Sequence, residues 1–168
     1  MGYLNKALGH LEYLAQHFYQ NDEEYIVRII LLEIGLPSKG RGYDYVVDAI
    51  LLYHQKEMRY MTKEIYPTVA KKYGIYVRPV QVEGAIRKAI EKAYLLRDEV
   101  WKCYFPEESK PTNAEFISRM ATILGFWNSC CEAQKREKGM KCYEEVRQYD
   151  HGATEEYYRE RNEKACAG

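Results

Sequence analysis

The sequence lacks any apolar run of the roughly 18 residues that a membrane-spanning helix requires. Its first residues, MGYLNKALGH, also lack the apolar core of a secretory signal peptide. An excess charge of either sign is absent too, because 25 lysine and arginine residues balance 25 aspartate and glutamate residues. We therefore expect a soluble, cytoplasmic protein with no membrane partner.

The motifs of common enzymes are missing as well. The sequence contains no glycine-rich phosphate loop, no HExxH zinc motif and no nucleophile elbow. Its five cysteines lack the CxxC spacing of a zinc site, and without an export signal we expect them to stay reduced. We predict that the protein is not an enzyme and that it uses no cofactor, no metal and no small-molecule substrate.

What the sequence does contain is apolar residues at the three- and four-residue spacing of amphipathic helices. This spacing predicts six helices, at residues 4–18, 25–34, 45–53, 63–73, 79–93 and 112–125. Within the fourth, Pro67 is either a kink or the first helical position. Thr112 and Glu115 form a capping box for the sixth, which is expected to end near Gly125. No strand pattern is present, so the predicted fold class is all-α.

The two ends of the chain are expected to differ from the domain between them. Residues 1–22 form an extra amphipathic helix, for which packing on its own domain is the more usual arrangement, although a homodimer is left open. Residues 23–127 form one compact multi-helix domain. Residues 128–168 are richer in charge, and we expect a partly helical extension there, with a second helix start at Thr154.

The fifth helix has one face that packs and one that is directed outward. The apolar side carries Val82, Ala85, Ile86, Ala89, Ile90 and Ala93, and the other carries Gln81, Gly84, Lys88 and Glu91. A short turn from Gly74 joins it to the preceding helix, which is the order of a helix-turn-helix that binds the major groove of DNA. Between Lys56 and Lys102 eleven positive residues face six negative ones, which favours phosphate contact. The same pattern is also typical of a helical hairpin whose cations are simply solvated.

Four segments from Ile26 to Leu124 carry a resemblance to a known family. They are EIGLPSKGRGYDY, TKEIYPTVAKKYG, VEGAIRKAIEKAY and KPTNAEFISRMATIL, in that order. This part of the chain resembles the C-terminal DNA-binding domain of stage zero sporulation protein A, the response regulator that initiates endospore formation. The resemblance implies an all-helical domain with a helix-turn-helix that binds duplex DNA at promoter boxes and regulates transcription in sporulation.

In that family the second helix contacts bases through an Arg-Val-Glu-Arg run followed by Ala-Ile-Arg-His. The same stretch here begins with Gln81 and has Gly84 at the second arginine position, whereas Glu83 and Arg87 carry over directly. The turn from Gly74 to Pro79 is longer than the family's. Gln81 can still contact adenine and Glu83 can accept from cytosine, but glycine contacts no base. The residues that we predict to contact DNA are Arg78, Gln81, Glu83, Arg87, Lys88 and Lys92.

These departures leave two functions open. The first is a stand-alone DNA-binding regulator with altered base specificity. It would lack the receiver domain that the family places before this domain, because too few residues precede the match. The second is a protein-interaction or antagonist module that kept the helical fold and lost sequence-specific DNA binding, which the missing arginines favour.

Overall fold

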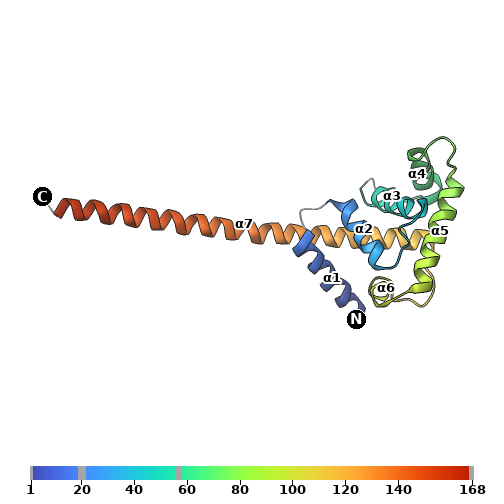
Figure 1. Ribbon diagram of the computed structural model, residues 1–168, viewed down its shortest axis with the longest axis horizontal. Coiled ribbons are helices and arrows are strands. Elements are labelled where there is room, and N and C mark those ends of the chain that lie inside the picture. The colour runs from blue at the N-terminus through green and yellow to red at the C-terminus, as the bar shows by residue number, and fades with distance from the viewer. Residues whose placement is uncertain (1, 19–21, 56–57, 167–168) are drawn as a thin grey trace. The chain divides into compact units, whose positions relative to one another are not determined.

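The structure is a computed structural model that describes residues 2–18, 22–55 and 58–166, with side chains between residues 5 and 139 of those ranges (Figure 1). These residues form seven α-helices, one π-helical turn and no strand, which confirms the all-α prediction. The elements are α1 (Gly2–Phe18), α2 (Glu23–Glu33), α3 (Arg41–Gln55), η1 (Met61–Ile65), α4 (Tyr66–Lys72), α5 (Pro79–Leu96), α6 (Glu99–Tyr104) and α7 (Asn113–Cys166). The chain divides into two compact units, Met1–Cys130 and Cys131–Gly168.

The core of the first unit contains a stack of aromatic rings. The ring of Trp101 in α6 stacks on Phe105 at a centroid distance of 4.7 Å, and Phe105 stacks on Phe116 of α7 at 4.9 Å. All three side chains are buried, and the inner face of α5 is buried with them in this core. Large aromatic surfaces removed from water supply much of the stability of a small domain.

Short polar side chains fix where several of the helices begin. The carboxylate of Asp22 accepts a hydrogen bond from the backbone N–H of Tyr25 at 2.8 Å and caps α2. At the start of α7, the backbone N–H of Glu115 donates to the Thr112 hydroxyl and the Thr112 N–H donates to the Glu115 carboxylate. This reciprocal pair is the capping box that the sequence predicts, and it satisfies amide donors that otherwise lack partners.

Helix α1 packs within the first unit. Its apolar stripe, including Leu11 and Leu14, is buried, and the helix contacts α6. The His10 imidazole bonds to the Tyr104 hydroxyl at 2.5 Å and lies 3.2 Å from the Glu33 carboxylate. Burial, together with the charge of Glu33, raises the pKa of Tyr104 above its ordinary value. The expected packing of this helix on its own domain is therefore confirmed.

The prediction that the last helix ends near Gly125 is wrong. Helix α7 runs through this glycine without interruption, and Leu124 and Trp127 on either side of it are buried. A glycine inside a helix costs about 1 kcal/mol relative to alanine, whereas burying a large apolar side chain contributes about 1.5–3 kcal/mol. The apolar stripe therefore continues the helix past the glycine.

The second unit contains the remainder of α7. The helix continues to Cys166, so the described residues 128–166 are more helical than expected and have no separate helix start at Thr154. Across the described residues, no helix is both long and apolar enough to span a membrane.

Candidate nucleic-acid interface

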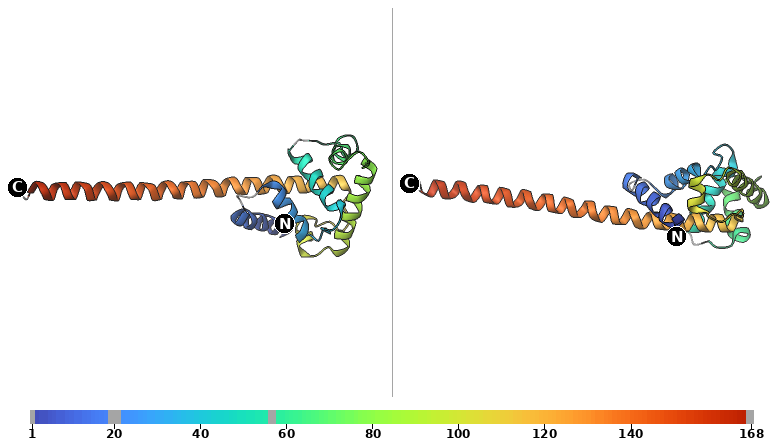
Figure 2. Two further views of the ribbon diagram at one scale, coloured as in Figure 1. Left: turned by 45° about the horizontal axis from the view of Figure 1, so that its top comes forward. Right: turned by 90° about the horizontal axis from the view of Figure 1, so that it is seen from below.

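Helices α4 and α5 follow each other in the order expected of a helix-turn-helix. Pro67 lies in the first turn of α4 rather than at a kink, directly after the π-helical turn. The chain reverses at Gly74, whose φ of 115° lies in the left-handed region that glycine adopts readily. Helix α5 then starts at Pro79 and packs on both α3 and α4 (Figures 1 and 2).

A buried carboxylate ties the end of α4 to α3. Asp48 is only 8% exposed and accepts hydrogen bonds from Lys72 Nζ at 2.6 Å and from the Tyr73 hydroxyl at 2.7 Å. Burial and the bond to Asp48 raise the pKa of Tyr73, so this hydroxyl remains a donor. A buried charge is stable only when it is paired, and this pairing positions the turn that precedes α5.

The first turn of α3 approaches the backbone of α5 closely. A Cβ atom placed on Gly42 would lie 2.9 Å from the carbonyl oxygen of Ala85 and 3.5 Å from Cβ of Ala89. No real Cβ contact is that short, so the absence of a side chain at Gly42 lets α3 and α5 pack together. The sequence gives no local signal for this role, because the contact joins residues far apart in the chain.

The predicted site residues lie on the outward side of α5, apart from Arg78, which directly precedes the helix. Five of these side chains are exposed to solvent: Arg78, Gln81, Arg87, Lys88 and Lys92. The sixth, Glu83, is half-buried at the edge of the outward face. Within the described part of the chain, Lys88 and Lys92 have no ion-pair partner. An exposed, unpaired cation keeps its full charge available for a phosphate.

Gln81 has a structural role that the sequence analysis missed. Its side-chain Oε1 accepts a hydrogen bond from the backbone N–H of Arg78 at 2.8 Å. This bond caps the first turn of α5. A bidentate contact to adenine needs both the oxygen and the nitrogen of the amide, and this oxygen already accepts the capping bond.

Glu83 and Arg87 line a cavity between α5 and the start of α7. The cavity measures about 380 Å³, and its walls also include Lys110 and Asn113. Arg87 lies 4.0 Å from the Glu83 carboxylate, and the Asn113 amide donates to the backbone oxygen of Glu83 at 3.2 Å. Lys110, 3.8 Å from Glu91, adds a cation that the sequence analysis did not include.

Gly84 lies in α5 itself, whereas Gly42 lies in α3 and packs against the backbone of α5. The two glycines differ in the space around them. A Cβ atom placed on Gly84 would meet nothing within 4 Å in the described structure. The glycine is therefore not required by packing within the domain. It leaves a gap in the middle of the outward face, between Gln81 and Lys88.

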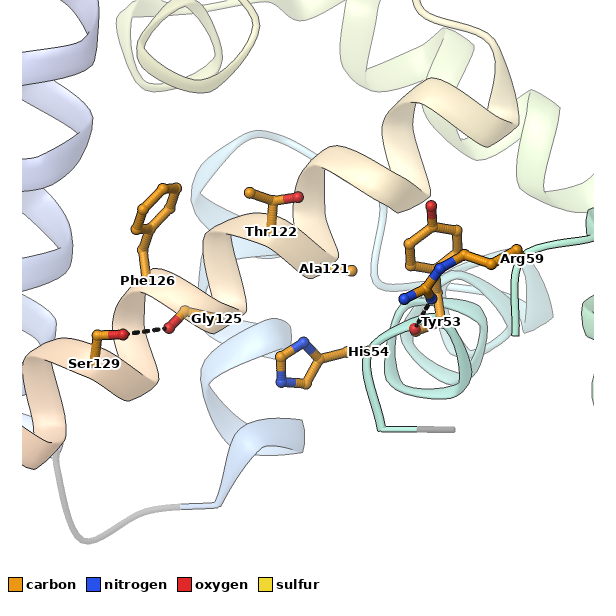
Figure 3. A pocket seen from close by; sticks show the side chains of 8 residues that line it. All are labelled: Tyr53, His54, Arg59, Ala121, Thr122, Gly125, Phe126 and Ser129. Carbon is orange, nitrogen blue, oxygen red and sulfur yellow. Dashed lines mark hydrogen bonds between the residues drawn. The ribbon is translucent and has the colours of Figure 1, made fainter. Parts of the chain in front are cut away.

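A second cavity of about 380 Å³ lies between the end of α3 and α7 (Figure 3). The Ser129 hydroxyl in its wall donates to the carbonyl oxygen of Gly125, and His54 instead lies 3.3 Å from the Glu23 carboxylate. Burial opposes ionisation of Glu23, but bonds from Gln55, Asn128 and His54 outweigh it and lower its pKa. The cavity thus shows no serine hydroxyl bonded to a histidine base, the pairing typical of nucleophilic catalysis.

One comparison with known proteins bears on these helices. The family described as "Sporulation initiation factor Spo0A C terminal" matches residues 27–124, which is more than half of the chain. The matched stretch contains α3, α4, α5 and α6 completely, together with most of α2 and the first part of α7. Helix α1 lies outside it.

Proposed function

Because the chain belongs to the family of the sporulation initiation factor Spo0A C-terminal domain, a family of DNA-binding domains and not of enzymes, we propose that it binds duplex DNA through the outward face of α5. In this proposal α5 enters the major groove, and the protein is a transcriptional regulator whose base specificity differs from that of the family. Arg87, Lys88 and Lys92 contact phosphates, while Gln81 and Glu83 contact bases.

The observation that carries this proposal is the contrast between the two faces of α5. Its inner face is fully packed, while its outer face presents exposed cations beside a glycine with open space around it. The cations supply attraction to phosphate whatever the DNA sequence is. Gly84 and the capping bond of Gln81 weaken base contacts at the two positions where the resemblance implies arginine, so altered specificity follows.

The experiment is selection from a randomised duplex pool at two salt concentrations, followed by affinity measurements on the enriched sequences. Arg87→Ala and Lys88→Ala are expected to weaken binding to all sequences, and Glu83→Gln to change base preference. Lys6→Ala, which removes an exposed lysine of α1, is the matched control and should bind like the wild type. Equal binding by the wild type and all three α5 variants would contradict the proposal.

The second candidate is a protein-interaction or antagonist module, favoured by the missing arginines at Gln81 and Gly84. It predicts no retention of DNA even at low salt. It also predicts a stable complex with a full-length regulator of the family, detected as an earlier-eluting peak in size-exclusion chromatography. DNA binding that responds to Arg87→Ala and Lys88→Ala would exclude it.

A further inference from the structure

We propose that Ile75 and Tyr76, in the turn before α5, contact the 5-methyl groups of thymine bases in the major groove, together with Val80. This inference rests on the proposed function, because it places the turn against the same DNA. It adds a base preference that the polar residues of α5 do not supply.

The turn projects its apolar residues away from the protein. The backbone N–H of Val77 donates to the carbonyl oxygen of Gly74 at 3.1 Å, so Ile75 and Tyr76 occupy the two corners of a hydrogen-bonded turn. Ile75 is 89% exposed and Tyr76 is 88% exposed. Val80, one helical turn before Gly84 on the outward face of α5, is 64% exposed.

The fold does not account for these exposed side chains. Corner positions of turns usually hold Gly, Pro, Asn, Asp or Ser, which suit the backbone and interact with water. A cluster of large apolar side chains at such a place is typical of a surface that another molecule covers. The turn also borders a hollow of about 260 Å³ whose walls include Pro67, Ala70, Val77 and Pro79.

The charges around the turn indicate what covers it. Lys71 precedes the turn and Arg78 follows it, and both are exposed. The neighbouring Lys72 is bound to Asp48 and adds no free charge. An apolar tip flanked by cations fits a partner with an apolar group between negative charges. Duplex DNA has this pattern in its major groove, where the thymine methyl group is the apolar feature of the base edges and phosphates lie on both sides.

The position of the turn agrees with this assignment. Ile75 and Tyr76 lie in the turn directly before α5, which begins at Pro79. In helix-turn-helix proteins the N-terminal residues of the second helix contact the base edges. The apolar corner thus lies at the N-terminal end of α5, the end where base contacts are expected.

The test compares thymine with uracil, which lacks only the 5-methyl group and keeps the same hydrogen-bonding edges. Randomised duplex pools are made with one base or the other and are titrated with the full-length protein at low salt. The wild type is expected to bind the thymine pool more tightly, by about fourfold for each methyl group that becomes buried. The double variant Ile75→Ser, Tyr76→Ser should bind the two pools equally, while Ile75→Val with Tyr76→Phe should keep the preference.

The possible results distinguish a failure of this inference from a failure of the proposed function. Salt-sensitive binding by the wild type with no thymine preference would overturn this inference and leave the proposed function standing. A preference that persists in the serine double variant would overturn the assignment to Ile75 and Tyr76. Failure of the wild type to bind either pool would overturn both. Because both side chains lie in solvent, the thermal unfolding of the double variant should match that of the wild type and exclude misfolding as the cause.

Discussion

The two faces of α5 differ in what holds their residues in place. On the inner face, Val82, Ile86 and Ile90 are buried against neighbouring helices, so any change in their volume disturbs the core. On the outer face, Lys88 and Lys92 are exposed, so packing does not constrain their size. The comparison shows that residues of the outer face can change without disturbing the packing that holds α5 in the fold.

The largest effect is expected on the inner face. Ile86→Ala removes part of a fully buried side chain, and we expect it to lower the free energy of unfolding by about 2–5 kcal/mol. Urea denaturation followed by circular dichroism measures this loss. Arg87→Ala, one residue along and exposed, should change the same quantity by less than about 0.5 kcal/mol. Equal losses of unfolding free energy in the two variants would show that the two faces of α5 contribute equally to stability.

Replacing each of two glycines by alanine should change the stability of the protein in opposite directions. Gly42→Ala places a methyl group 2.9 Å from the carbonyl oxygen of Ala85, so we expect it to destabilise the protein by about 1–3 kcal/mol. Gly84→Ala places the same group in open space and should stabilise α5 by about 0.5–1 kcal/mol. Thermal unfolding of both variants shows whether each substitution raises or lowers the stability. A destabilising Gly84→Ala would mean that this glycine has a packing role.

Restoring an arginine to the outer face sharpens the comparison further. We expect Gly84→Arg to fold normally, because nothing in the described structure lies within 4 Å of the new Cβ atom. If α5 lies in the major groove, the arginine should favour guanine at one position of the bound sequence by about 1–3 kcal/mol. Duplex selection with the variant and the wild type in parallel measures this gain. An unchanged selected sequence would place Gly84 away from the bases.

The smallest effect concerns Glu23, which lies outside α5. Its pKa in the folded protein lies below the ordinary value of 4.5, so its bonds to Gln55, Asn128 and His54 stabilise the fold above that pH. The contribution, about 1 kcal/mol, is lost as the pH falls through the folded-state pKa. Glu23→Gln should therefore have a lower free energy of unfolding than the wild type at neutral pH. This difference in free energy should become smaller below about pH 4.5. DNA binding at neutral pH should not change in this variant.

Much of the fold could be predicted from local sequence patterns. The helical spacing located α5 and its buried residues, and Thr112 with Glu115 marked the start of α7. The end of α7 was not predictable from its glycine. Gly125 is a weak helix breaker, and the burial of Trp127 that extends the helix depends on neighbours distant in the sequence.

The candidate site was predictable only in part. The exposure of Lys88 and Lys92 follows from helical periodicity, and the structure bears it out. Lys110 and Asn113 were missed, because they join Glu83 and Arg87 around one cavity only after the chain folds back. The cap made by Gln81 was missed as well, although its spacing of three residues from Arg78 is a signal that could have indicated it.

The sequence by itself determined the all-helical class, the two faces of α5 and the family, because periodicity and motifs are carried by residues close together in the chain. The tertiary structure decided which glycine is required for packing, which side chains surround Glu83, and that α1 packs against α6. These are contacts between distant segments. A local pattern contains no information on the partner that such a contact brings near, so only the folded chain can supply it.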